Sequence, residues 1–388
     1  MKHSFSNPFP WYNHMLKQNP VTYDEDFLHY FGAKGTWHIF RYDDVQKVFQ
    51  DHETFSNEYF PKIAESPVSI AMSVTDPPRH KQLRLLISKA FTPKAIEDMK
   101  PWIEQITHEL LDQVEDKGEM DVTRDLAVPI PIQVIAKLLG ISHKDQDKFK
   151  KWSIMFAKQP SEVDGGAEGY FQAQKEMSEY FLRMIKFRKQ EPEDDLISQL
   201  LQAEVDGEKL SANDVLAFCI LLLIAGNETT TNLINNAIFT FIEHPEVQEH
   251  LIDHPEDITK AIEEVLRYRS PLQYINRIAA KDTELRGKRI KKGDFINLWM
   301  GSANRDESVF ANPNEFDIHR TNLKHTAFGH GIHYCMGAPL ARLEANIALR
   351  VLLGRLHQFQ LKDHKQPVMN QSAVTYSIKE FPVTFQKR

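Results

Sequence analysis

The feature that most constrains the fold is a long apolar stretch that indicates a single helix of about 33 residues. It begins at Ser211, where Asp214 three residues later can form a variant of the capping box, and it runs to about Glu243, where His244-Pro245 ends it. At 1.5 Å per residue, such a helix extends roughly 50 Å, enough to cross a whole domain. Its first half is apolar on nearly every side, which predicts a central, buried helix.

The rest of the chain is predicted to be mainly helical with a small β-rich lobe. Strand patterns occur in residues 20–42, clearest at 36–40, and in residues 272–300, with a hairpin signal at Arg286-Gly287-Lys288. Loop signals fill residues 301–336. No linker rich in Pro, Gly or Ser divides the chain, so we expect one domain over residues 1–388. Amphipathic segments typical of helices cover residues 43–50, 79–90, 93–117, 129–139, 144–157, 166–189, 193–203 and 338–353.

Charge and composition exclude several classes of protein. The net charge of -7 and the absence of a run of five basic residues argue against a nucleic-acid-binding surface. With two cysteines, Cys219 and Cys335, a disulfide framework is improbable. The N-terminus has no apolar signal core, and the longest apolar stretch, residues 215–226, is shorter than the roughly 20 residues that span a bilayer. We therefore expect a cytoplasmic protein without a membrane anchor.

One cysteine lies in a glycine-rich loop directly before a predicted helix. The loop is Phe328-Gly329-His330-Gly331-Ile332-His333-Tyr334-Cys335-Met336-Gly337. Free N–H groups and the positive end of the following helix favour a thiolate there. Two plainer interpretations are a surface turn with an incidental cysteine and a zinc site that uses His325, His330 or His333, although zinc sites usually show paired ligands.

A second unusual pattern interrupts the long helix. The run Ala225-Gly226-Asn227-Glu228-Thr229-Thr230 places a small pair, an acid and hydroxyl groups in an otherwise apolar segment. Glycine costs about 1 kcal/mol relative to alanine inside a helix, and local rules broken without structural gain tend to mark function. A notch at Gly226 could admit a small ligand such as O₂, to which Thr229 could donate a hydrogen bond. The alternative is a polar face with Glu228 in solvent, and Asn227 has no role that we can derive.

Together these two patterns resemble the cytochrome P450 family. Its cysteine loop, Phe-Gly-x-Gly-x-His-x-Cys-x-Gly, is matched at every fixed position, and its acid–alcohol motif, Ala-Gly-x-Glu-Thr-Thr, is matched as well. The resemblance implies the cytochrome P450 fold, with heme b (iron protoporphyrin IX) between the long central helix and the cysteine loop. It implies that Cys335 is the iron ligand and that Glu228 and Thr229 are catalytic, managing O₂ and protons. It also places Ala225, Gly226, Phe328 and Gly337 against the cofactor.

Further motifs follow in the family's order. Glu264 and Arg267, which alone could be a surface ion pair, resemble the family's Glu-x-x-Arg helix, in which a further arginine, here Arg320, braces the region behind the cysteine loop. The resemblance also implies four donors to the heme propionates: His80, Arg84, Arg277 and His333.

The function implied is that of an oxidoreductase, a heme-thiolate monooxygenase that hydroxylates a hydrophobic substrate such as a fatty acid, terpenoid or steroid-like molecule. No G-x-G-x-x-G fingerprint for flavin or nicotinamide is present, so electrons should come from a separate ferredoxin or flavodoxin with its reductase. A basic face near Lys89, Lys94, Arg342 and Arg350 could dock that partner, although scattered surface charge is the alternative. The remaining hypotheses are a peroxide-driven heme peroxygenase and a non-catalytic heme sensor. Candidate residues of the substrate pocket are Ile70, Leu272, Val374 and, as a polar tether, Gln273.

Overall fold

The computed structural model describes the chain except residues 1–3, 5, 30–32, 61–66 and 157–165. Its contacts divide the chain into two compact units. We call Met1–Pro61, Thr107–Ala127 and Asn232–Arg388 the cysteine unit, and Lys62–Ile106 with Val128–Thr231 the helical unit. The expectation of a single domain stays a prediction.

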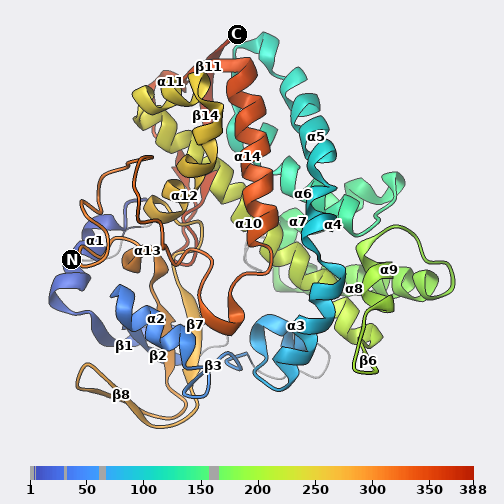
Figure 1. Ribbon diagram of the computed structural model, residues 1–388, viewed down its shortest axis with the longest axis vertical. Coiled ribbons are helices and arrows are strands. Elements are labelled where there is room, and N and C mark those ends of the chain that lie inside the picture. The colour runs from blue at the N-terminus through green and yellow to red at the C-terminus, as the bar shows by residue number, and fades with distance from the viewer. Residues whose placement is uncertain (1–3, 5, 30–32, 61–66, 157–165) are drawn as a thin grey trace. The chain divides into compact units, whose positions relative to one another are not determined.

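A five-stranded sheet forms the β-rich lobe of the cysteine unit (Figure 1). Its β1–β2 hairpin and the β10–β7 pair are antiparallel, whereas β10 runs parallel to β2. Apolar side chains of the sheet, such as Ile39 and Ile296, form a buried core with Val45 and Phe49 of the neighbouring helix α2. In order across the sheet, the strands are β1 (Val21–Leu28), β2 (Lys34–Ile39), β10 (Phe295–Leu298), β7 (Ile275–Ala279) and β3 (Phe55–Ser56), and α2 spans Tyr42–Gln50.

The same unit contains further helices and small sheets. The loop itself contains the short 3₁₀ helix η8 (Gly331–His333). The helices are α1 (Phe9–Gln18), α11 (Pro245–Asp253), α12 (Ile258–Tyr268), α13 (Met300–Ala303) and α14 (Ala338–Arg355). The small sheets are β11 (Leu356–Leu361) with β14 (Pro382–Lys387) and β4 (Glu119–Asp121), β8 (Thr283–Leu285) with β9 (Lys288–Ile290), and β12 (Val368–Met369) with β13 (Ile378–Glu380).

The helical unit is built from helices, the short 3₁₀ turn η1 (Pro67–Ile70) and one small hairpin. Helix α5 (Lys100–Asp112) begins in this unit, and α10 contributes its first part, up to Thr231. The other helices are α3 (Arg79–Ala90), α4 (Pro93–Glu97), α6 (Pro129–Leu138), α7 (Gln146–Phe156), α8 (Gly166–Gln190) and α9 (Leu196–Gln202), and the hairpin is β5 (Glu204–Val205) with β6 (Glu208–Lys209).

The predicted long helix is present as α10, a continuous helix of 32 residues over Ala212–Glu243. Its capping box is confirmed, because the Asp214 backbone N–H donates to Ser211 Oγ at 3.1 Å and the Ser211 N–H donates to Asp214 Oδ2 at 2.9 Å. Length and composition would let α10 cross a membrane, but 61% of its most apolar window is buried inside the protein. That burial is typical of a core helix.

Some helices differ from the sequence analysis. The helix expected over residues 93–117 is divided into α4 and α5, and Pro101 occupies the first turn of α5, where proline is tolerated. Helix α9 begins at Leu196 instead of residue 193, because Asp195 acts as its N-cap and accepts a hydrogen bond from the Ser198 N–H at 2.8 Å. Helices α1 and α11 were not predicted at all.

Candidate active site

The cysteine loop is held against the end of α2. Gly331 has φ of 72°, and a methyl group added there would lie 2.7 Å from the Phe49 carbonyl oxygen, so a larger residue would push the loop away. The Cys335 backbone N–H donates to the Phe328 carbonyl oxygen at 2.9 Å and closes the loop. The glycine pattern seen in the sequence thus has a local cause in the close approach of two backbones.

The Cys335 thiol lies just before the N-terminus of α14, and the residue is partly exposed. Unpaired N–H groups and the dipole at that end favour the thiolate form. A methyl group at Gly337 would meet a single atom within 4 Å, the Cys335 sulfur at 3.9 Å, so the space beside the sulfur is open to a flat group. Cys219, in contrast, is fully buried, and its burial raises the pKa of the thiol.

A zinc site at this loop is not supported. His325 Nε2 lies 3.2 Å from Glu263 Oε2, and His330 Nε2 lies 3.0 Å from the Gln50 side-chain nitrogen. Among the described residues, no group of three His, Cys, Asp or Glu side chains is arranged to hold a metal ion. Cys335 is thus left as a single sulfur donor, which is the donor set that a heme iron takes from a cysteine ligand.

Arg277 lies on β7 in the neighbourhood of the cysteine loop. Its guanidinium is buried, 5.2 Å from the centre of the Phe49 ring, and donates to the Asn276 carbonyl oxygen at 2.7 Å. The same Phe49 ring would lie 3.7 Å from a methyl group at Gly329, so Phe49 contacts both Arg277 and the loop. The cysteine unit thus brings together five of the expected cofactor-binding residues: Arg277, Phe328, His333, Cys335 and Gly337.

The brace behind the loop is confirmed. Glu264 and Arg267 are fully buried on α12 and form two hydrogen bonds of 2.7 and 2.8 Å. Arg320 donates to the same carboxylate at 3.2 Å. Arg267 also donates to the carbonyl oxygens of Asn304, Pro313 and Glu315, so it fixes the connection that precedes the cysteine loop.

A second acid of α12, which the sequence analysis did not single out, holds the loop itself. Glu263 accepts a bidentate pair of hydrogen bonds from Arg342 at 2.6 and 2.9 Å, and the Arg342 guanidinium lies 4.5 Å from the centre of the Phe328 ring. Burial alone would raise the pKa of Glu263, but the hydrogen bonds from His325 and Arg342 lower it to about 2. Arg342 is therefore bound to Glu263, and its place in a docking face stays a prediction.

The helical unit places α3 against the start of α10. Arg79 of α3 forms an ion pair of 2.5 Å with Asp214 of α10. The next residue, His80, is buried, and Arg84, one turn later, is partly exposed. The ion pair thereby fixes the helix that carries two of the expected propionate donors relative to the helix that carries the acid–alcohol pair.

The acid–alcohol segment differs from the expectation in two respects. The Thr229 hydroxyl donates to the Ala225 carbonyl oxygen at 2.6 Å, so its hydrogen is engaged within the helix. The position of the expected notch at Gly226 faces α6, because a methyl group there would lie 2.7 Å from Ile135 Cδ1. The glycine thus permits close helix packing. Glu228 is partly buried, and the buried Asn227 amide makes no hydrogen bond to a described residue.

The candidate pocket residues lie in different settings. The buried Gln273 amide accepts a hydrogen bond from the Tyr12 hydroxyl at 2.6 Å and donates to the Ser270 carbonyl oxygen, and its role as a substrate tether stays a prediction. The segments of Leu272 and Val374 do lie side by side, since Leu272 pairs with Thr375 and the Gln273 N–H donates to the Val374 carbonyl oxygen at 2.7 Å. In the helical unit, Ile70 is exposed at the end of η1.

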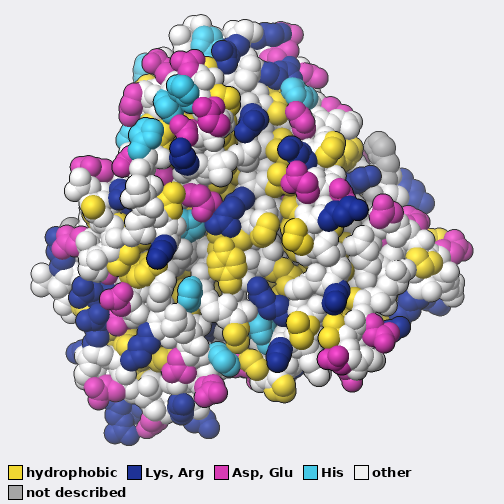
Figure 2. Space-filling model, in the orientation of Figure 1, with side chains coloured by type: hydrophobic (Ala, Val, Ile, Leu, Met, Phe, Trp, Pro, Cys, Tyr) yellow, Lys and Arg dark blue, Asp and Glu magenta, His cyan; other side chains and the backbone are white. Residues whose placement is uncertain are grey.

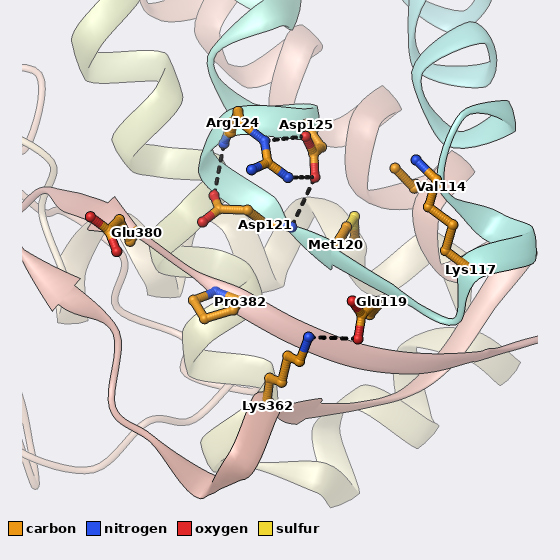
Figure 3. A pocket seen from close by; sticks show the side chains of 10 residues that line it. All are labelled: Val114, Lys117, Glu119, Met120, Asp121, Arg124, Asp125, Lys362, Glu380 and Pro382. Atoms are coloured by element: carbon orange, nitrogen blue, oxygen red, sulfur yellow. Dashed lines mark hydrogen bonds and ion pairs between the residues drawn. The ribbon is translucent and has the colours of Figure 1, made fainter.

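A hollow elsewhere on the cysteine unit does not offer a second active site. It has a volume of about 380 Å³ and lies beside β4 and β14 (Figure 3). Its charged side chains pair with one another, as Lys362 does with Glu119 at 2.7 Å and Arg124 with Asp125 at 2.7 Å. We therefore place the candidate active site at the cysteine loop and not at this hollow.

The chain belongs to the cytochrome P450 family, whose sequence model matches residues 9–254 and 258–385. It is 42% identical over 384 residues to a protein named putative cytochrome P450 YjiB from Bacillus subtilis, covering 97% of this chain and 93% of that protein. The crystal structure of substrate-free CYP109E1 from Bacillus megaterium aligns with a TM-score of 0.93 at 39% identity, covering 98% and 99% of the two chains. A structure of CYP109E1 in complex with testosterone aligns with a TM-score of 0.88 at 40% identity over 97% and 99% of the chains.

Family membership settles the fold, the class of enzyme and the cofactor. The protein has the cytochrome P450 fold, is a monooxygenase of that family and uses heme b. The residues at the cysteine loop fit that cofactor, because they supply one sulfur donor, an open face beside Gly337 and a buried arginine close by.

Proposed function

We propose that this monooxygenase inserts one oxygen atom of O₂ into a C–H bond of a large hydrophobic substrate, with electrons from a ferredoxin or flavodoxin and its reductase. The observation that carries the proposal is the Cys335 loop, with its open face at Gly337 and its support by α12. The balanced reaction is RH + O₂ + 2 e⁻ + 2 H⁺ → ROH + H₂O. We place it in the cytoplasm and assign residues 1–388 to one heme domain.

In this proposal the chain would hold the cofactor with a thiolate and four side-chain donors. Cys335 would ligate the iron, and Arg277, His333, His80 and Arg84 would donate to the two propionates. The planar fork of an arginine suits a carboxylate, and the burial of Arg277 strengthens such a pair by excluding water. When bound, the heme supplies the oxidising chemistry, which its thiolate ligand favours.

The proton path is assigned to Glu228 and Thr229. The Thr229 hydroxyl gives its own hydrogen to the Ala225 carbonyl oxygen, so its oxygen is left with lone pairs that accept a hydrogen bond. In that state the Thr229 hydroxyl oxygen accepts a hydrogen bond from a proton-bearing group in the pocket and so orients that group. Glu228, the preceding residue, exchanges protons with solvent. This refines the sequence-based expectation that Thr229 donates.

The test of this path is the coupling of electrons to product in Thr229→Ala. The variant should still bind heme and substrate and still consume reductant, because it keeps Cys335 and the four proposed propionate donors. Product per electron pair should fall and hydrogen peroxide should rise, since positioned proton transfer typically contributes roughly 10²–10⁴-fold. Thr229→Ser, which keeps the hydroxyl, is the matched control. Unchanged product per reductant in Thr229→Ala would remove Thr229 from the mechanism.

The proposed substrates are steroid-like molecules, long-chain fatty acids and terpenoids. The support is the similarity to CYP109E1, which has been crystallised with testosterone, and the apolar character of the paired segments around Leu272 and Val374. Each compound of a panel is titrated into the protein, and binding is measured from the shift of the Soret band. At least one of the three classes should give a shift that saturates. Shifts with small polar ligands alone would contradict the proposal.

Turnover assays on the wild-type protein distinguish this function from the two alternatives. A peroxygenase should turn over faster with hydrogen peroxide than with reductant and a surrogate ferredoxin. A heme sensor should show the Soret shift without any reductase-dependent product. The proposed enzyme requires both O₂ and the electron donor.

A further inference from the structure

Glu263 of α12 joins the two chain segments that flank Cys335. Its carboxylate accepts the bidentate pair from Arg342 of α14 at 2.6 and 2.9 Å and lies 3.2 Å from His325 Nε2. The Ala327 N–H donates to His325 Nδ1 at 3.3 Å, so the hydrogen of the neutral ring is on Nε2 and points to Glu263. We call Glu263, His325 and Arg342 the clamp.

The clamp contacts aromatic side chains on both sides of the cysteine. The Arg342 guanidinium lies 4.5 Å from the centre of the Phe328 ring and donates to the Tyr334 hydroxyl at 3.4 Å. Tyr334 directly precedes Cys335, and the Cys335 N–H donates to the Phe328 carbonyl oxygen at 2.9 Å. A shift of the guanidinium therefore moves the residues that fix the cysteine backbone.

The clamp differs from the brace of Glu264 and Arg267 in its exposure to solvent. The side chains of Arg342 and Glu263 are 32% and 21% exposed, whereas those of the brace are fully buried. On the face shown in Figure 2, basic and acidic side chains lie beside hydrophobic ones where α14 and the cysteine loop reach the surface. A pair that solvent reaches contributes less to stability than a buried one, but its bidentate geometry still fixes the direction of the guanidinium.

We propose that the clamp positions the Cys335 sulfur and thereby sets the reduction potential of the iron. This rests on the proposed function, in which Cys335 is the axial ligand. Contacts around a ligand orient it and tune the metal, and a thiolate pushes electron density toward iron, which stabilises the oxidised state. Holding the sulfur in place therefore keeps the potential low. The three clamp residues are positioning residues, since they act through the cysteine loop.

The test is a redox titration of heme-loaded variants whose charges change in opposite directions. Glu263→Gln removes a negative charge and Arg342→Gln removes a positive one, but each breaks the bidentate pair. Both variants should raise the reduction potential, and the double variant should raise it no further than either single variant. At a fixed applied potential the ratio of reduced to oxidised heme should rise by about tenfold, since losing a contact that orients a ligand typically costs about 10–100-fold in metal affinity.

Two further variants control for charge and for loss of stability. Arg342→Lys keeps the charge but loses the planar fork, so it should also raise the potential, and its partial exposure favours folding. Arg188→Gln breaks a buried ion pair with Asp195, 2.5 Å apart, in the helical unit. It should lower the free energy of unfolding without a change in the potential.

Three results would overturn the proposal: opposite shifts in Glu263→Gln and Arg342→Gln, which residues acting by charge alone should give; an unchanged potential in the clamp variants; or an equal shift in Arg188→Gln. The red-shifted carbon-monoxide band, compared between the wild type and Cys335→Ser, tests the ligand itself. Failure of the proposed function would appear in that band, whereas failure of the clamp would appear in the potentials of proteins that keep it.

Discussion

Replacing Arg267 by alanine should destabilise the protein far more than replacing an exposed arginine by alanine, although each substitution removes one ion pair. Arg267 is fully buried and donates five hydrogen bonds, two to Glu264 and three to backbone carbonyl oxygens of the connection before the cysteine loop. Its removal leaves the buried Glu264 with Arg320 as its remaining cationic partner. It also removes the arginine donor from the Asn304 and Pro313 carbonyl oxygens, whereas that of Glu315 still accepts from Arg320 at 3.3 Å.

The magnitude follows from the burial of the pair. Breaking a buried ion pair by removing one partner costs about 3–5 kcal/mol, because the other charge stays desolvated. The matched control is Arg289→Ala, where the arginine side chain is 76% exposed and its partner Asp282 55% exposed. Exposed pairs contribute about 0–1 kcal/mol. We therefore expect Arg267→Ala to lower the free energy of unfolding by at least 2 kcal/mol more than Arg289→Ala, as about 3 kcal/mol is the low end of the first range and about 1 kcal/mol the high end of the second.

The assay is equilibrium unfolding in urea followed by far-ultraviolet circular dichroism, with the Soret band recording heme retention. If Arg267→Ala does not accumulate as folded protein, Arg267→Lys and Arg289→Lys provide the same comparison, since lysine keeps the charge but loses the planar fork. Equal unfolding free energies for the buried and exposed variants would refute the reasoning.

Three further outcomes test single residues. Cys335→Ser should abolish the red-shifted carbon-monoxide difference band, because a hydroxyl replaces the thiolate poorly, whereas Cys219→Ser should keep it; retention of the band in Cys335→Ser would disprove the ligand. Burial raises the pKa of Glu344 from 4.5 to about 8, so between these values the folded state holds a proton that the unfolded state releases, and stability should fall as pH rises, by up to about 1.4 kcal/mol per pH unit. Glu344→Gln should show a shallower fall from pH 5 to 8 in urea titrations, and parallel curves would contradict this. Gly226→Ala should cost about 1–3 kcal/mol through overpacking, and Ile135→Val, which lacks Cδ1, should recover part of that loss; additive effects in the double variant would show that the contact is unimportant.

The features that the sequence predicted well are those set by residues close together in the chain. Ser211 and Asp214 of the capping box are three positions apart, as are Glu264 and Arg267. The glycines of the cysteine loop likewise indicate, from the loop sequence alone, where the backbone adopts a positive φ angle. Short-range geometry is fixed by the helix period and by allowed backbone angles, so it can be derived without knowledge of the fold.

The partners that were missed are distant in sequence. Glu263 and Arg342 are 79 positions apart, and Arg79 and Asp214 are 135 apart. No period or spacing encodes such a pair, and an acid on a helix face resembles any other acid until the chain is folded. The same limit hides the hydrogen bond from the Tyr12 hydroxyl to the Gln273 amide, 261 positions away.

Thr229 shows how a correct motif can still mislead about the direction of a hydrogen bond. A hydroxyl group has one hydrogen, and inside a helix the nearest acceptor is the carbonyl oxygen four residues earlier, here that of Ala225. Because the helix takes the hydrogen first, the hydroxyl oxygen keeps only its lone pairs, and in the proposed mechanism it can accept a hydrogen bond but not donate one. The sequence identifies the residue, but the local backbone decides whether its side chain donates or accepts, so a mechanism built on this residue must start from the helix and not from the motif.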